Sequence, residues 1–122
     1  IRGIDHRIDS HNLGARDLTA APSIGLAAAN AGVANGPVDV AEVHAPFTHQ
    51  EVIVRRELGL ADDANVNPSG GPLAANPMMA AGLIRLGEVA QRILDGSANR
   101  GVAHATSGHL LQQNLVAVLE GN

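Results

Sequence analysis

Asn67-Pro68-Ser69-Gly70-Gly71-Pro72-Leu73-Ala74-Ala75-Asn76-Pro77 is the segment that decides how this chain is interpreted. Its three prolines and two glycines stand directly in front of a long, proline-free stretch that is rich in alanine. Glycine lets the backbone approach a ligand closely, and the amino end of a helix favours negative charge. The segment therefore predicts a loop that brings a ligand close to the start of a helix.

The composition around this segment indicates one layered domain with a core of small side chains. The chain has 122 residues, of which 45% are hydrophobic, and Phe47 is its only aromatic residue. A chain of this length forms one domain with a core of its own. Because that core must be built from Ala, Val, Leu and Ile, its helices and strands are expected to approach one another closely.

Charge and cysteine content exclude several classes of protein. The net charge is −4 and there is no basic stripe, which argues against a nucleic-acid binder. No apolar run approaches the roughly 20 residues that cross a bilayer. Cysteine is absent, so the chain has no disulfide, no thiolate metal site and no cysteine nucleophile of its own. We expect an intracellular, cytoplasmic location.

The hydrophobic pattern predicts helices and strands in alternation. Apolar and polar residues alternate in the first two expected strands, and the last two are short, mainly apolar segments. In the expected helices, apolar residues recur at helical spacing. The expected helices lie near residues 19–35, 47–58 and 77–94, and the expected strands lie near residues 4–8, 38–43, 101–105 and 115–119. Residues 59–72 are expected to be loop, and residues 106–114 a turn. This order favours an α/β layered domain.

Three short motifs lie at junctions between these elements. Val43-His44-Ala45-Pro46-Phe47 follows a strand and opens a helix, and the segment 67–77 precedes the next helix. The segment 104–114 joins the last two strands. In this order, the three motifs resemble the C-terminal half of the thiolases, in particular the sterol-carrier-protein type. The resemblance covers about residues 18–121.

The resemblance implies a fold, a substrate and a partner. Thiolases have two similar halves in a five-layered αβαβα fold, and they make or break a carbon–carbon bond next to a coenzyme A thioester. Residues 1–17 would then be a partial N-terminal segment and residues 18–122 a thiolase-like C-terminal domain. The substrate would be an acyl-CoA of lipid metabolism, with no further cofactor. The partner would be an N-terminal thiolase half on the same or another chain, in a homo- or hetero-oligomer without a membrane span or nucleic acid.

The first two motifs place two candidate catalytic residues. His44 matches the Asn or His position that contributes to an oxyanion hole for the thioester oxygen. The alternative is a histidine that caps the following helix. Asn76 matches the histidine of the Gly-His-Pro motif, and an amide donates a hydrogen bond to an oxyanion but cannot take a proton from a thiol. The alternative for Asn76 is a turn that starts the helix.

The third motif departs furthest from the thiolase pattern. Leu110 matches the position of the acid/base cysteine and has no proton to give. His109 is the candidate substitute, because histidine in general is an acid and base near neutral pH. Neighbouring residues of an extended chain, however, point to opposite sides. His104 lies in an expected strand and is expected to be a partly buried histidine whose hydrogen bonds are satisfied. Ser69, Gly70 and Gly71 are candidate substrate-binding residues that shape the loop, or else form a tight turn that lets the helix pack. No metal site is expected.

Two functions from different classes remain at this stage. One is an acyltransferase component that completes an active site with an N-terminal thiolase half. The other is a non-catalytic partner subunit, because the usual cysteine and histidine are both replaced. Cleavage of a CoA-linked aldol ranks lower, since the relatives that perform it use tyrosines and this chain has none. In either case the helix near residues 77–94 is expected to lie in a buried central layer, so the isolated chain should aggregate.

Overall fold

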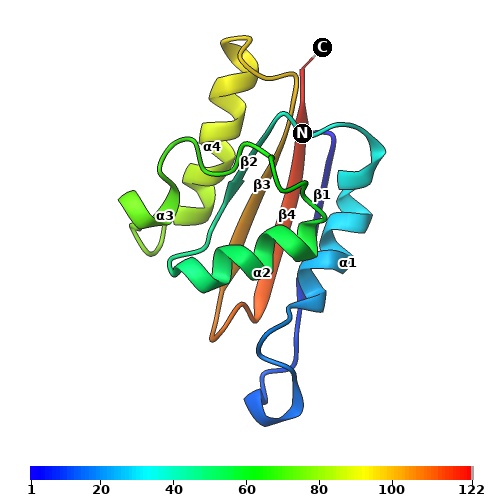
Figure 1. Cartoon of the computed structure of the whole chain (residues 1–122), viewed down its shortest axis with the longest axis vertical. Coiled ribbons are helices and arrows are strands. Elements are labelled where there is room, and N and C mark those ends of the chain that lie inside the picture. The colour runs from blue at the N-terminus through cyan, green and yellow to red at the C-terminus, as the bar shows by residue number, and fades with distance from the viewer. Residues whose placement is uncertain (122) are drawn as a thin grey trace.

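The computed structural model describes residues 1–121 and has a four-stranded sheet between helices on its two faces (Figure 1). The α/β fold class predicted from the sequence is confirmed. In chain order the elements are β1 (Gly3–Ile8), the 3-10 helix η1 (Leu13–Ala15), α1 (Pro22–Ala31), the 3-10 helix η2 (Val33–Asn35), β2 (Val40–Val43), α2 (Thr48–Leu58), α3 (Gly71–Ala74), α4 (Ala81–Leu94), β3 (Arg100–Ser107) and β4 (Gln113–Glu120).

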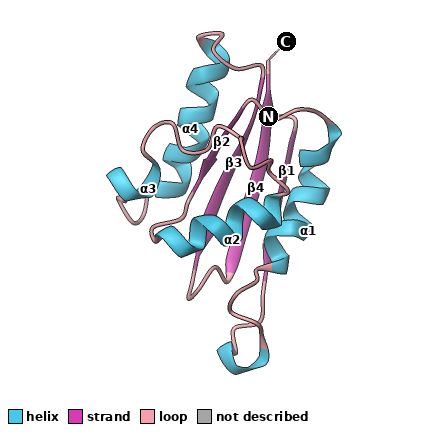
Figure 2. Ribbon diagram, viewed as in Figure 1, coloured by secondary structure: helices cyan, strands magenta, loops and turns pink. Residues whose placement is uncertain are grey.

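The strands follow the order β1-β4-β3-β2 across the sheet (Figure 2). β2 runs parallel to β3, and β4 pairs antiparallel with both β3 and β1. All four strands lie close to the positions predicted from the sequence. β3 and β4 extend further toward each other than expected, since Ser107 pairs with Gln113, so the predicted turn shortens to residues 108–112.

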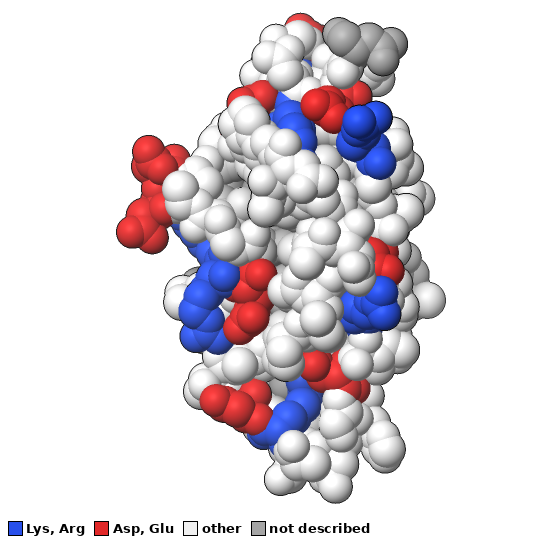
Figure 3. Space-filling view, turned by 90° about the vertical axis from the view of Figure 1, so that its right-hand side faces the viewer, with Lys and Arg blue, Asp and Glu red and all other residues white. Residues whose placement is uncertain are grey.

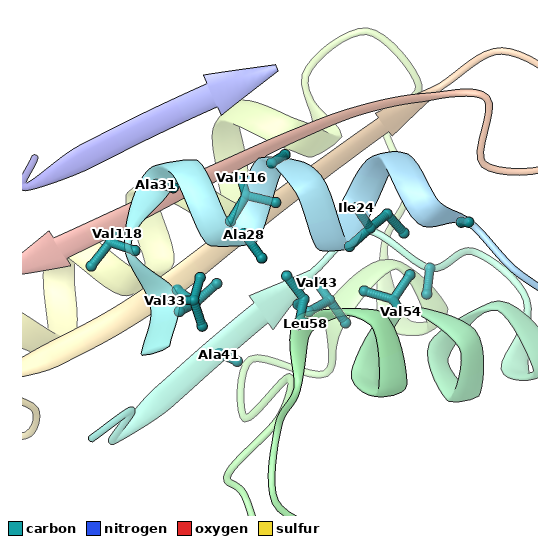
Figure 4. Packing of buried hydrophobic residues seen from close by; sticks show 14 of the residues in the cluster. Ile24, Ala28, Ala31, Val33, Ala41, Val43, Val54, Leu58, Val116 and Val118 are labelled. Carbon is teal, nitrogen blue, oxygen red and sulfur yellow. The ribbon is translucent and has the colours of Figure 1, made fainter. Parts of the chain in front are cut away.

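The face of the sheet that carries α1 and α2 holds the larger core (Figure 4). Ile24 of α1 and Val54 of α2 are fully buried against Val43 of β2. Many of the remaining core residues are alanines and valines, and these small side chains let helices lie close to the sheet. The core is thus built from aliphatic residues, as the composition requires.

The opposite face carries α4. Val89 of this helix is fully buried against Val40 and Ala103 of the sheet. Gly101 lies directly beneath the helix, where an added Cβ would collide with the side chain of Val89. The outer side of α4 exposes two leucines, Leu83 at 74% and Leu94 at 82%, together with Gln91. The expected central position of this helix between two layers of a larger assembly stays a prediction.

Helix ends differ from the prediction at three places. The helix expected over residues 19–35 is divided, because α1 ends at Ala31 and Gly32, with a φ of 80°, separates it from the 3-10 helix η2. The helix expected from residue 77 begins at Ala81, because the preceding residues form a turn in which Ala80 and Ala81 both donate to the carbonyl of Pro77. The segment expected to be loop ends in the short helix α3, whose second residue is Pro72. Proline is compatible with the first turn of a helix, because backbone N–H groups in that turn have no partner within the helix and proline simply lacks one.

The N-terminal residues belong to the same sheet. β1 pairs with β4 along its length, so residues 3–8 form one edge of the sheet. The division of the chain at residue 17 stays a prediction.

Charged side chains occur in small groups of mixed sign. On the face shown in Figure 3, acidic and basic residues alternate and no basic stripe is visible. Among residues 1–121, no helix has the length and apolar character needed to cross a membrane.

Candidate functional site

The candidate site lies at the carboxyl ends of β2 and β3, which are parallel neighbours. His44 follows β2 directly, and Thr106 lies near the end of β3. In sheets of this kind, ligands bind at the carboxyl ends of the strands. A pocket of about 620 Å³ opens here, lined by His44, Pro46, Phe47, Gln50, Asn76, Met78, Met79, Thr106, Ser107, Gly108, His109, Leu110 and Leu111. The structure therefore brings together the three predicted catalytic residues, His44, Asn76 and His109.

His44 is held by hydrogen bonds at both ring nitrogens. Its Nε2 lies 3.0 Å from Oδ1 of Asn76, and its Nδ1 lies 3.1 Å from the carbonyl oxygen of Thr106. A protonated imidazole donates to both oxygens. In the neutral form one nitrogen must accept, and the N–H of Thr106, 3.4 Å from Nδ1, is a donor at that end. The ring is therefore fixed in orientation, with 8% of His44 exposed to solvent.

The loop 67–77 is anchored at its beginning and open at its end. Asn67 has a φ of 52°, and its side-chain oxygen accepts a hydrogen bond of 2.8 Å from the N–H of Val43. Its amide nitrogen donates to Glu51 at 3.1 Å. Asn76, at the other end of the loop, is exposed and points its side-chain oxygen at His44. The loop thus positions one amide in the pocket while its first residues are fixed to β2 and α2.

A buried ion pair holds the middle of the same loop. The carboxylate of Glu42 accepts from the N–H and the hydroxyl of Ser69, at 3.0 and 2.7 Å. Arg85 of α4 donates to Glu42 at 2.9 Å and to the Ser69 hydroxyl at 3.1 Å. We call Glu42, Ser69 and Arg85 the Glu42 cluster. Ser69, Gly70 and Gly71 do not line the pocket, so the structure does not bring these predicted substrate-binding residues to His44.

The turn between β3 and β4 forms the far wall of the pocket. His109 is exposed and Leu110 is 41% exposed, and both line the pocket. Leu110 and Leu111 have φ values of 53° and 58°, in the left-handed region that L-residues rarely adopt. Arg16 holds this conformation by donating to the carbonyl oxygens of His109 and Leu110, at 2.8 and 3.1 Å. Strained backbone of this kind occurs preferentially at functional sites.

A chain of buried hydrogen bonds supports the turn from inside. Nδ2 of Asn114 donates to the carbonyl of Leu111 at 2.8 Å and to the hydroxyl of Ser23 at 2.7 Å. Ser23 in turn donates to Asp9 at 2.6 Å. Nε2 of His104 lies 3.0 Å from Oδ1 of Asn114. His104 is thus hydrogen-bonded in part, as expected, but it is fully buried and its Nδ1 has no partner within residues 1–121.

The environment of His104 keeps its ring neutral. Burial lowers its pKa to about 4, against the opposing effect of the hydrogen bond to Asn114, and the neighbouring His44 lowers it further. Desolvation disfavours the charged imidazolium, which explains the direction. His104 is therefore a structural histidine below the pocket and not a proton donor at neutral pH.

Arg16 and Asn114 are supporting residues that the sequence did not indicate. Arg16 lies more than 90 residues from the turn that it holds, and no spacing rule connects the two. Asn114 lies in the segment 104–114, but its contact with Ser23 joins residues 91 positions apart. The rare left-handed conformation of Leu110 leaves no mark in the sequence. Among residues 1–121, no three His, Asp or Glu side chains converge as metal ligands would.

Comparisons with known proteins show which sequences and folds the chain resembles. No protein-family model matches the chain. The chain is 41% identical over 70 residues to a beta-ketoadipyl-CoA thiolase of Pseudomonas putida, a match that covers 57% of the chain and 18% of that relative. The whole chain superposes on 30% of human mitochondrial 3-ketoacyl-CoA thiolase with a TM-score of 0.74 and 21% identity.

The superposition shows that the fold is that of a thiolase fragment. Together with the sequence match, it confirms the resemblance to the C-terminal half of the thiolase superfamily. The chain spans less than a third of the length of either relative.

Proposed function

We propose that this chain is a thiolase-like acyltransferase component that acts on acyl-CoA thioesters by Claisen or retro-Claisen carbon–carbon chemistry. It completes an active site with an N-terminal thiolase half on the same or another chain. The observation that carries this proposal is the hydrogen bond of 3.0 Å between His44 and Asn76 at the wall of a pocket. Two of the three thiolase-like motifs deliver these side chains to one point.

His44 and Asn76 have the chemistry of an oxyanion hole. When a thioester carbonyl is attacked or its enolate forms, negative charge develops on the carbonyl oxygen. Fixed N–H donors that point at this oxygen stabilise the transition state more than the ground state. The amide of Asn76 supplies such donors, and the imidazole of His44 supplies one when its bond to Asn76 is exchanged for one to the substrate.

The covalent step uses a residue from the other half. The resemblance implies a cysteine thiolate that attacks the thioester carbonyl, so that a new carbon–sulfur bond forms and coenzyme A leaves as its thiolate. That thiolate takes up one proton. His109, at the pocket rim, is the candidate donor of that proton, because Leu110 has no proton to supply.

A second function competes with this one. The positions matched by Asn76 and Leu110 lack the histidine and cysteine of the thiolases, which favours a non-catalytic partner subunit. The apolar residues outside the core fit such a role, because Met78, Met79 and Leu83 are all largely exposed. In this case the chain would contribute an interface and not a reactive group.

Release of coenzyme A from an acyl-CoA by the complete protein separates the two functions. We expect His44→Ala to lower the turnover about 100-fold or more, as the loss of an oxyanion-hole donor does in other enzymes. His11→Ala, an exposed histidine outside the pocket, is the matched control and should retain full activity. A partner subunit without a catalytic role predicts equal turnover for both variants.

A further inference from the structure

Gln50 is a polar residue of the pocket that the proposed function leaves without a role. It lies in the first turn of α2 and lines the same pocket as His44 and Asn76. Gln50 is only 7% exposed. Its side-chain oxygen is shielded from solvent and has no hydrogen-bond partner within residues 1–121. Across the same residues, its amide nitrogen donates no hydrogen bond to the protein either.

A buried side-chain oxygen without a partner is unfavourable unless a group outside residues 1–121 donates a hydrogen bond to it. A buried polar group that lacks a partner loses its hydrogen bonds to water and gains none in return. The backbone of Gln50 needs no particular side chain, since its N–H already donates to the carbonyl of Phe47 at 3.0 Å. A leucine or methionine would fill the same space without an unpaired oxygen. Packing therefore does not explain the amide.

The surroundings of Gln50 are those of a ligand-binding wall. Phe47, Met78 and Leu110 present apolar surface to the pocket. A few polar groups set into an apolar wall are what fixes the orientation of a bound small molecule. Gln50 is such a group, at a different place in the pocket from the pair His44 and Asn76, which already bond to each other.

We propose that Gln50 is a ligand-binding residue, whose carboxamide hydrogen-bonds a ligand group that both donates and accepts. This inference rests on the proposed function, since the ligand is taken to be an acyl-CoA. A carboxamide offers an acceptor oxygen and a donor nitrogen, so a hydroxyl or a secondary amide satisfies it whichever atom faces inward. In an acyl-CoA this group is a hydroxyl on the acyl chain or an amide of the pantetheine arm.

Titration calorimetry with two thioesters distinguishes these sources. Butyryl-CoA and 3-hydroxybutyryl-CoA share the pantetheine arm and differ by one acyl hydroxyl. In the complete protein, we expect Gln50→Leu and Gln50→Met to weaken thioester binding about tenfold. This is the usual effect of leaving one hydrogen bond to a ligand unmade. If the partner is the acyl hydroxyl, only 3-hydroxybutyryl-CoA is affected. If it is a pantetheine amide, both thioesters are affected equally.

Gln91→Leu is the matched control, since Gln91 is an exposed glutamine of α4 outside the pocket. It should bind both thioesters like the wild type. Wild-type affinity for both thioesters in the two Gln50 variants would overturn the role of Gln50 and leave the proposed function intact. Loss of the folded circular dichroism spectrum in both variants would also overturn it, because Gln50 would then stabilise the fold. If the wild type binds neither thioester, both the role of Gln50 and the proposed function are contradicted.

Discussion

The Glu42 cluster and the pocket both involve the end of β2, and they differ in how their main polar groups are paired. In the Glu42 cluster, a fully buried carboxylate accepts hydrogen bonds from Ser69 and from Arg85. In the pocket, His109 is exposed and the amide of Gln50 makes no bond within residues 1–121. The paired carboxylate of Glu42 fixes the loop to the sheet, although Nε of Arg85 has no partner within residues 1–121. An unsatisfied polar group beside a cavity, in contrast, is available to a ligand.

The difference explains how one loop serves both regions. Ser69 ties the loop to the Glu42 cluster, and seven residues later Asn76 reaches His44. The loop that the sequence predicts to bind a ligand therefore has two parts. We call Ser69 its anchor and Asn76 its delivering end. Substitutions at the anchor should change stability, and substitutions at the delivering end should change activity.

Breaking the ion pair of the Glu42 cluster should have the largest effect on stability. Arg85→Met leaves the carboxylate of Glu42 buried without its main charged partner, which costs about 3–5 kcal/mol of the free energy of unfolding. Urea unfolding followed by circular dichroism measures this change. The double variant Glu42→Met, Arg85→Met removes both charges and should recover most of the loss. Equal destabilisation in the single and double variants would show that packing, and not the ion pair, holds the cluster.

Acid should destabilise the fold through His104. Its folded pKa of about 4 lies below the ordinary value of 6.5, so between these pH values the unfolded chain binds a proton that the folded chain does not. The free energy of unfolding should therefore fall as the pH drops from 6.5 to 4, by roughly 3 kcal/mol from this group alone, and show no contribution from it above pH 6.5. His104→Gln should flatten the pH dependence of stability in this window. An unchanged slope would mean that the ring is not held neutral.

Two loop variants sharpen the contrast between anchor and delivering end. Ser69→Ala removes the hydroxyl between Glu42 and Arg85 and should cost roughly 1–3 kcal/mol of stability, with little change in turnover at a temperature where the protein is folded. Asn76→Ala should lower turnover about ten- to 100-fold while changing the free energy of unfolding by less than about 0.5 kcal/mol, because its side chain is exposed. If Ser69→Ala lowered the turnover and Asn76→Ala lowered only the stability, Ser69 and not Asn76 would be the residue that acts in the pocket.

Much of the fold could be predicted from the sequence because its elements carry local signals. Residues 115–119 form a short, continuous apolar run with two valines, which indicates a buried strand whatever it pairs with. The helix near residues 47–58 shows its amphipathic pattern and ends at Gly59, which has a φ of 69°. The start of α4 was placed too early because Pro77 opens a turn and not the regular helix.

The site was predictable only in part, for a physical reason. His44, Asn76 and His109 lie in short motifs, and the pocket brings all three together. The supports of the pocket depend on contacts between residues far apart along the chain, such as that of Arg16 with Leu110. The same holds for Gln50, whose unpaired amide is evident only once the burial of its neighbours is known.

The most direct test of the central claim is the rate of coenzyme A release by the complete protein with and without the imidazole of His44. The oxyanion-hole role predicts that His44→Ala retains the folded circular dichroism spectrum and loses about 100-fold or more of the turnover. Full turnover in a folded His44→Ala protein would contradict that role and leave the chain as a structural partner.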